Sequence, residues 1–550
     1  MTSRTGELSH AGTSLPEGAS HAVPVPEGQS ADRRIAFLLG VASAAIVLAG
    51  KGWEASLTFD SAYYIQAARH LLEGLGLTVW GPDAARVPLS HFPPLYSLVL
   101  AAGMGLGLAA QTASGIVNLV VAASFPAMLY LLLRRSGTGR GACLFATGLI
   151  TFYPDTMTAL LTVSTEGPFL VLLLLLAWLL IVYLQAPTPG RLAGLAALAA
   201  ASSMLRFAGM FTGPAAAGVL LLRRRRSGRF AGPVLMALAS TLPVFVYGRM
   251  VGAGEDDLVS LPVSFFAPHL KDLKDLLYTF TSWVLPILGD RIAVFTAAGA
   301  LLLLVLLLWL RVRSAQPSGP ILPPPGTPRD LSLVGGVFFL VYLLLVAASR
   351  FFVHPAVAFN TRILLPAYLM LLLALTPHLE RVSTRLLLSR RERGLALILG
   401  LFLVLQNVSG SAEVLHKSRT VGLRHSHAAW RTSSLLEAAR DLPHDRPLLT
   451  NTPSLVYFYA GRPSVLLPFP ADTPARARAS RLRLQELGQL IKERGAWLVG
   501  VQDHRHEALY GLPYFLKTRE PDAITPFADG VLVEWDPPPV SSGPSEGRDP

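Results

Sequence analysis

The sequence predicts an α-helical protein that crosses a membrane many times and carries a small α/β domain near its C-terminus. Of its 550 residues, 52% are hydrophobic and only 15% are charged, and the mean hydropathy is +0.47. A soluble protein has about 25% charged residues. Runs such as Leu170–Leu184 and Leu301–Leu310 contain no charge, and apolar stretches of roughly 20 residues span bilayers. Most of the chain is therefore expected to lie in a membrane.

We predict eleven membrane spans from the apolar runs. They are Arg34–Gly52, Ser114–Leu133, Gly141–Thr156, Gly167–Leu184, two spans sharing Leu192–Leu222, Phe230–Tyr247, Ala293–Leu310, Leu331–Ala348, Ile363–Pro377 and Gly394–Val408. Arginines follow the even-numbered spans, as with Arg223–Arg226 after the sixth. Positive residues favour the cytoplasmic side. The N-terminus is therefore expected in the cytoplasm and the C-terminal region on the extracytoplasmic side of the cell membrane.

The segments outside the spans differ in composition. Residues 1–32 are rich in Ser, Gly, Pro and His and are expected to be a disordered cytoplasmic tail. Residues 33–408 form the predicted transmembrane domain. Residues 409–536 alternate short apolar runs with helical patterns, which is typical of an α/β domain. Residues 537–550 form a second predicted disordered tail. In the first outer loop we expect helices that lie at the membrane interface.

The net charge of +12 does not indicate nucleic-acid binding, because the arginines cluster at the ends of spans. The single cysteine, Cys143, excludes an intrachain disulfide or a cysteine metal site. Two histidine pairs, His425 with His427 and His504 with His506, lack carboxylate partners in the nearby sequence. We therefore predict no metal site.

Asp60 lies shortly after the first predicted span, at the start of a segment with helical spacing. Tyr64, Ala67, Ala68 and Leu71 follow it at helical spacing. Asp60 stands where an N-cap is expected, and capping alone would explain it. The N-terminus of a helix also favours an ionised carboxylate, so Asp60 is a candidate catalytic base as well.

Further charged residues on the outer side are candidates for substrate binding. Glu166 opens the fourth span, where an acid is costly unless it is solvated, used, or caps the span together with Thr165. The guanidinium group matches phosphate geometry, so Arg206, Arg350 and Arg362 are candidate ligands of a donor phosphate. Arg350 and Arg362 stand at span ends and have the alternative of snorkelling to lipid headgroups.

Aromatic residues near Asp60 are expected to line the same site. They are Tyr63 and Tyr64 in the predicted helix and the segment from His91 to Tyr96. Asp155, which follows a proline, is assigned to a loop.

Several segments, in order, resemble the dolichyl-phosphate-mannose–protein mannosyltransferase-like family (glycosyltransferase family 39) of the C-type glycosyltransferase superfamily. FDSAYYIQAARHLLEG and FPPLYSLVL are similar to its first outer loop, STEGPFLVLLLLL to the acid at its fourth span, and GLAALAASSMLRFAGM to its fifth segment. NTRILLPAYLMLLL is similar to its R-x-L-L-P span, and LLTNTPSLVYFYAGRPSVLLP to the start of its outer domain. The similarity extends over about residues 35–470.

The resemblance implies a membrane enzyme that transfers a sugar from a polyprenyl-phosphate donor on the outer face. In the family an aspartate of the first outer loop acts at the acceptor, and Asp60 stands at that position. Many relatives have Asp-Glu there, whereas Ser61 follows Asp60 in this chain. The hypothesis is an inverting transferase in which Asp60 is the base, Glu166 supports or binds the acceptor, and an arginine holds the phosphate. The acceptor is a glycan, a lipid or a protein.

The chemistry agrees with this hypothesis. A phosphate leaving group needs no general acid, unlike the alkoxide of glycoside hydrolysis, so one carboxylate that accepts a proton is enough. A cation must stabilise the departing phosphate. An arginine side chain would supply this positive charge without a cofactor. A bound divalent cation is the alternative.

Two other functions are compatible with the sequence. A transporter or lipid flippase would also have outer loops and intramembrane arginines, although no inverted repeat is found. A scaffold protein with a decayed site is the third interpretation, because Ser61 replaces an acid.

Overall fold

The computed structural model describes residues 27–81, 83–223, 231–251, 270–283, 328–352, 359–386, 390–468, 474–502 and 512–538. The predicted eighth span, Ala293–Leu310, lies outside the described residues, as do most of the two predicted tails and part of the last outer loop.

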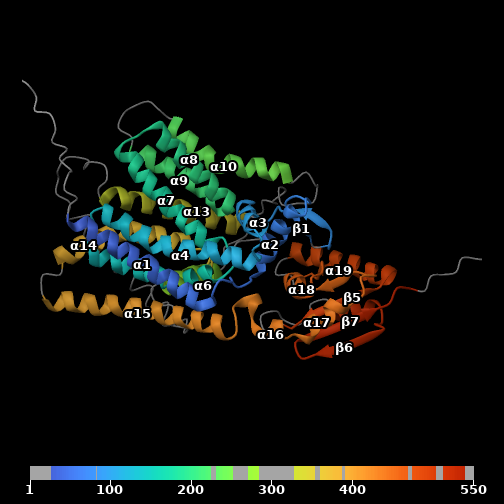
Figure 1. Ribbon diagram of the computed structural model, residues 1–550. Coiled ribbons are helices and arrows are strands. Elements are labelled where there is room, and N and C mark those ends of the chain that lie inside the picture. Colours follow the sequence, from blue (N-terminus) through green and yellow to red (C-terminus); the bar gives the residue numbers. More distant parts are fainter. Residues whose placement is uncertain are drawn as a thin grey trace, which may run out of the picture.

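Long apolar helices form an elongated bundle, and a smaller domain follows at one end (Figure 1). In the described part, six helices are long and apolar enough to cross a membrane. They are α1 (Glu27–Lys51), α4 (Ala110–Arg135), α7 (Glu166–Gln185), α10 (Ala231–Val251), α13 (Pro328–Phe352) and α15 (Arg390–Thr420). Shorter apolar helices, among them α3 (Leu95–Gly105) and α14 (Leu365–Leu386), pack between them. The predicted polytopic helical fold is confirmed, and the count of eleven spans stays a prediction.

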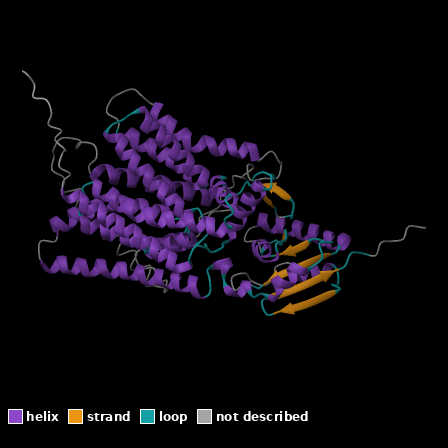
Figure 2. Ribbon diagram, viewed as in Figure 1, coloured by secondary structure: helices purple, strands orange, loops and turns teal. Residues whose placement is uncertain are grey.

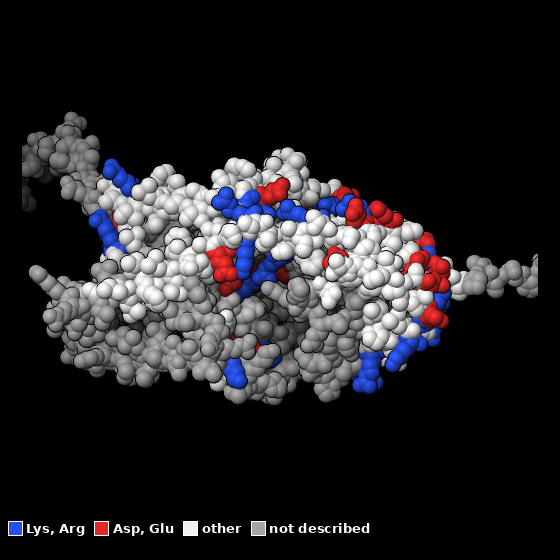
Figure 3. Space-filling model, turned by 90° about the horizontal axis from the view of Figure 1, so that it is seen from below, with Lys and Arg blue, Asp and Glu red and all other residues white. Residues whose placement is uncertain are grey.

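The outer surface of the bundle is apolar, as contact with lipid requires. Large hydrophobic side chains are exposed on the long helices, for example Phe37 on α1, Phe245 on α10 and Ile398 on α15. In the face shown by Figure 3, charged side chains gather near the centre and over the C-terminal domain, whereas much of the bundle is uncharged.

Two apolar segments are interrupted where polar residues occur: one was predicted as a single span, and the other as two spans. The segment predicted as Gly141–Thr156 forms α5 (Arg140–Thr151) and α6 (Pro154–Leu161), because Pro154 begins a new helix as its first residue. The segment Leu192–Leu222 forms α8 (Pro189–Leu205), η1 (Phe207–Phe211) and α9 (Thr212–Leu222), with Arg206 extended between the first two. Both breaks place polar residues beside the N-terminus of α7.

The segment after α1 is fixed between α4 and the start of α7. Ala55 N donates to Gln111 O at 3.0 Å, Ser56 N to Leu161 O at 2.8 Å, and Val163 N to Ser56 O at 2.8 Å. Gly115 on α4 allows this close approach, since a Cβ atom there would lie 1.8 Å from the carbonyl oxygen of Trp53. The residues that precede Asp60 are therefore held by backbone contacts to two helices.

The C-terminal domain is a five-stranded sheet with helices on both faces (Figure 2). Its strand order is β4 (Val465–Leu466), β3 (Leu448–Thr450), β5 (Ala496–Val501), β7 (Gly530–Trp535), β6 (Ala523–Phe527). The first three are parallel and the last two pair antiparallel. All residues of β5 are buried, because α19 (Pro474–Arg494) packs on one side and α17 (Ser434–Asp441) with α18 (Pro453–Ala460) on the other.

The domain boundaries differ from those expected. Helix α1 begins at Glu27, inside the segment expected to be a disordered tail. Helix α15 continues to Thr420 through the boundary expected at residue 408, because no proline interrupts it. Beyond it, η2 (Arg424–Ser426) and α16 (Ala428–Arg431) lead into the sheet domain. The helical part and the sheet domain are in contact: Arg69 of α2 (Phe59–Leu72) lies over the ring of Tyr457 in α18, 5.5 Å from its centroid.

Candidate active site

Thr58, not Asp60, caps the helix that carries Asp60. The Thr58 hydroxyl accepts a hydrogen bond from Ser61 N at 3.3 Å, and the Ser61 hydroxyl accepts one from Thr58 N at 2.7 Å. These reciprocal bonds form a capping box. Ser61 also donates to the carbonyl of Val163 at 2.9 Å and is fully buried. The expectation that Asp60 is the N-cap is therefore wrong, because the cap falls two residues earlier and leaves the Asp60 carboxylate available to other groups.

Thr58→Ala is expected to shift Asp60 and thereby to weaken the sugar transfer that the sequence resemblance implies. Loss of an N-cap costs about 1 kcal/mol of stability, and here it also frees the first turn of α2. The matched control is Thr188→Ala, since Thr188 caps α8 by accepting from Arg191 N at an exposed site. Thermal unfolding and transfer rates are measured on both. Equal activity of the two variants would contradict the positioning role of Thr58.

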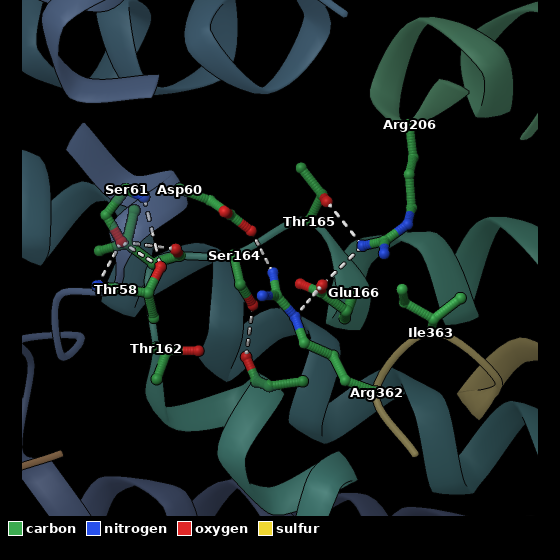
Figure 4. Close-up of polar contacts among 12 residues, drawn as sticks. Thr58, Asp60, Ser61, Thr162, Ser164, Thr165, Glu166, Arg206, Arg362 and Ile363 are labelled. Carbon is green, nitrogen blue, oxygen red and sulfur yellow. Dashed lines mark hydrogen bonds and ion pairs between the residues drawn. The ribbon is translucent and has the colours of Figure 1, made fainter. Parts of the chain in front are cut away.

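Asp60 and Glu166 are joined by Arg362 (Figure 4). Arg362 Nη2 donates to Asp60 Oδ2, and its Nε donates to Glu166 Oε1 at 2.6 Å. Arg206 Nη1 donates to the same Glu166 oxygen at 2.6 Å and to Thr165 Oγ1 at 3.3 Å. The cluster unites α2, the start of α7, the break after α8 and the loop before α14. Glu166 therefore binds two arginines, and the hydroxyl of Thr165 does not cap α7.

The cluster contains two carboxylates and two guanidinium groups. The Glu166 side chain is only 4% exposed, whereas that of Arg362 is 34% exposed. A buried charge is costly unless it is paired, and here every charge has an opposite partner. Burial alone would lower the pKa of Arg362, but the carboxylates of Glu166 and Asp60 more than offset this and raise the pKa above its ordinary value. Arg362 is therefore a permanent cation beside both acids.

The third candidate arginine lies in a different ion pair. Arg350, in the last turn of α13, binds Asp272 of α11 (Leu270–Ser282) at 2.7 Å. The structure thus brings Arg206 and Arg362 together with the acids and gives Arg350 its own carboxylate.

The predicted aromatic residues lie on both sides of α2. Tyr63 stacks on His91 with ring centroids 6.0 Å apart. Tyr64 meets the edge of Tyr96 at 5.1 Å, and both of these rings are buried. Tyr96 also shares a hydrogen bond with Ser114 of α4 at 2.8 Å. Tyr64 and Tyr96 therefore hold α2 against α3 and α4, while Tyr63 and His91 lie nearer the surface.

A small cavity lies beside the cluster. It is lined by Thr58, Asp155, Thr158, Ala159, Thr162, Ser164, Glu166, Arg362 and Arg424. Asp155 lies in the first turn of α6, not in a loop, and it lines the same cavity as Glu166. Arg424 comes from the linker to the C-terminal domain, and no pattern in the sequence indicates it. Among the described residues, no group of three or more His, Cys, Asp or Glu could hold a metal ion.

Comparisons with known proteins agree with this architecture. Residues 91–247 match the family model described as dolichyl-phosphate-mannose-protein mannosyltransferase. The structure is similar to that of ArnT from Cupriavidus metallidurans in the apo state, with a TM-score of 0.52 and 14% identity over 92% of this chain and 98% of that chain. The chain therefore shares the fold of ArnT.

A second solved structure is similar over most of this chain. It is the arabinofuranosyltransferase AftD from mycobacteria, with a TM-score of 0.53 and 16% identity over 92% of this chain and 40% of that chain. A search of the curated proteins found no match. The predicted resemblance to the mannosyltransferase family is confirmed by the match of its family model. The family match includes Glu166 and Arg206 but neither Asp60 nor Arg362, so the roles of those two residues depend on the geometry.

Proposed function

We propose that this protein is an integral-membrane, inverting glycosyltransferase that moves a sugar from a polyprenyl-phosphate donor to an acceptor on the extracytoplasmic face. A fold alone does not fix a reaction. The observation that carries the proposal is the position of Arg362, which joins the carboxylates of Asp60 and Glu166 at the edge of a cavity.

Asp60 is the base in this proposal. The acceptor oxygen forms a bond to the anomeric carbon of the sugar while the bond from that carbon to the phosphate oxygen breaks. The acceptor proton passes to the Asp60 carboxylate, and the polyprenyl phosphate leaves as an anion. Asp60 suits this role because it lies in the first turn of α2 and because its side chain is 19% exposed.

Arg362 stabilises the departing phosphate. Its guanidinium is more exposed than that of Arg206, so an incoming phosphate meets it first. Binding of the phosphate to Arg362 loosens the ion pair with Asp60, and the freed carboxylate can then accept a proton. Arg206 remains paired with Glu166, so the buried acid keeps a cation throughout.

The location and the partners follow from the same chemistry. The apolar helices support a place in the cell membrane. Nucleotide sugars are cytoplasmic, so a transferase on the outer face needs a lipid-linked donor. The N-terminus is then cytoplasmic and the C-terminal domain extracytoplasmic, where a glycan, lipid or protein acceptor is available.

The test is transfer of radiolabelled sugar from a panel of polyprenyl-phosphate sugars, using membranes that contain the protein and a crude envelope fraction as acceptor. We expect transfer from at least one donor above membranes without the protein. A parallel arm measures movement of a fluorescent polyprenyl phosphate across vesicles. Lipid movement without sugar transfer from any donor would contradict the proposal and favour a flippase. A chelator arm shows whether a divalent cation takes part.

A further inference from the structure

The linker between α15 and the sheet domain is attached to Leu57, the residue that precedes the N-cap of α2. His425 N donates to Leu57 O at 3.1 Å, and Leu57 N donates to Ser426 Oγ at 2.7 Å. Leu57 and Ser426 are both buried. Buried backbone groups need a hydrogen-bond partner inside the protein. Both polar groups of the Leu57 backbone therefore depend on the linker.

The shape of the linker presents these two residues to Leu57. Ala428 N donates to Val421 O at 2.6 Å and closes the loop between them. Gly422 has a φ of 80°, and a Cβ atom there would lie 2.1 Å from Ser426 O. Glycine adopts such a backbone without a steric penalty. Arg424 is also left-handed, with a φ of 49°. The tight turn that carries His425 and Ser426 is thus specified by the sequence.

The sheet domain holds the other side of His425. Tyr459 of α18 donates its hydroxyl proton to His425 O at 2.6 Å. Ser454 of the same helix shares a hydrogen bond with His425 Nε2 at 2.8 Å, and the imidazole meets the ring of Phe458 with centroids 6.4 Å apart. His425 therefore binds α18 through its carbonyl and its side chain, and it binds Leu57 through its backbone N–H.

The sheet domain contacts the first outer loop at two further places (Figure 1). Arg69, in the last turn of α2, lies over the ring of Tyr457. Asp83, in the segment that follows α2, forms an ion pair with Arg483 of α19 and a backbone bridge with Val465 of the edge strand β4. The sheet domain is therefore in contact with the residues before α2, with its last turn and with the segment after it.

These contacts join the sheet domain to Asp60 without a break. Helix α18 holds His425, the linker holds Leu57, and the next residue, Thr58, caps the helix that carries Asp60. We propose that the sheet domain positions Asp60 through His425 and Ser426, which are positioning residues. The effect on sugar transfer rests on the proposed function, whereas the positioning itself does not. A domain that only recognised the acceptor would need no bond to this segment.

Amide hydrogen exchange of residues 55–64 in detergent is the first measurement. Ser426→Ala removes the acceptor of Leu57 N, and Tyr459→Phe removes the bond from α18 to His425. Each is expected to raise exchange by about fivefold or more, the effect of losing one buried hydrogen bond. The control is Ser433→Ala, which also removes a hydroxyl that accepts from a backbone N–H, at Leu436 in α17. It is expected to leave the exchange of 55–64 unchanged.

Unchanged exchange in Ser426→Ala or in Tyr459→Phe would overturn the inference, because the segment would then be held without the linker or without the sheet domain. If Ser426→Ala does not fold, Tyr459→Phe decides, with the exposed Tyr514→Phe as its control. If the unmodified protein transfers no sugar, the proposed function fails, while hydrogen exchange still decides whether the sheet domain holds this segment.

Kinetics then measure the consequence for transfer. Ser426→Ala is expected to lower kcat by about tenfold, since small misplacements of a catalytic group are costly, with KM for donor and acceptor within twofold of normal. Combined with Thr58→Ala it is expected to lose less than the product of the two single losses, because both changes free the same segment. A raised KM for the acceptor with normal kcat would overturn the inference and make the linker part of acceptor binding.

Discussion

Asp60→Asn is expected to reduce sugar transfer by about 100-fold or more while the protein stays folded. A positioned base contributes about 10²–10⁴-fold to a rate, and an amide cannot accept the proton of the acceptor. The amide oxygen still accepts the hydrogen bond of Arg362, so the cluster keeps its shape. The measurement is the initial rate at saturating donor and acceptor, in membranes with equal amounts of each protein.

Asp272→Asn is the control for that variant, because Asp272 is also an aspartate paired with an arginine. It is expected to retain transfer. An Asp60→Asn protein that transfers sugar at the normal rate would refute the assignment of Asp60, and Glu166 would become the next candidate base.

Glu166→Gln is expected to abolish transfer and to lower the thermal stability. The substitution leaves Arg206 without a carboxylate among the described residues and leaves Arg362 with Asp60 alone. Removing one partner of a buried ion pair costs about 3–5 kcal/mol, because the other charge stays buried. Thermal unfolding in detergent and the transfer rate measure the two effects.

The double variant Glu166→Gln with Arg206→Gln separates stability from activity. It restores the charge balance, so its unfolding temperature is expected to lie above that of Glu166→Gln, while transfer stays low. Arg350→Gln serves as the control for Arg206→Gln, because Arg350 is also paired with a carboxylate but lies outside the cluster. Normal stability of Glu166→Gln would show that water, and not Glu166, compensates the two guanidinium groups.

Hydrophobic runs gave good predictions of the long helices, because lipid requires apolar side chains and internally satisfied backbones. The fourth predicted span, Gly167–Leu184, corresponds to α7 at Glu166–Gln185. The apolar run around Ala496–Val501 coincides with the central strand β5. The edge strand β6 has no such buried apolar run, because four of its five residues are exposed.

The site was less predictable from the sequence, since its contacts join residues far apart. The residue types of Asp60, Glu166, Arg206 and Arg362 marked them as candidates. However, only the packing of α2, α7 and the loop before α14 shows that Arg362 bridges two acids separated from it by 302 and 196 positions. Arg350 has the same chemistry and a similar place at a span end. Packing against α11 gives it a different partner.

In the proposed transferase, helix α15 has a consequence for the choice of acceptor. Its 31 residues extend about 46 Å, whereas the hydrocarbon core is about 30 Å thick. The end of the helix, where Glu413 and Lys417 form an exposed ion pair at 2.5 Å, therefore projects into water. Because α15 is a continuous helix, its length determines how far the sheet domain lies from the lipid. One added turn would raise the domain by about 5.4 Å, and acceptors would then be selected by how far their target group reaches from the bilayer.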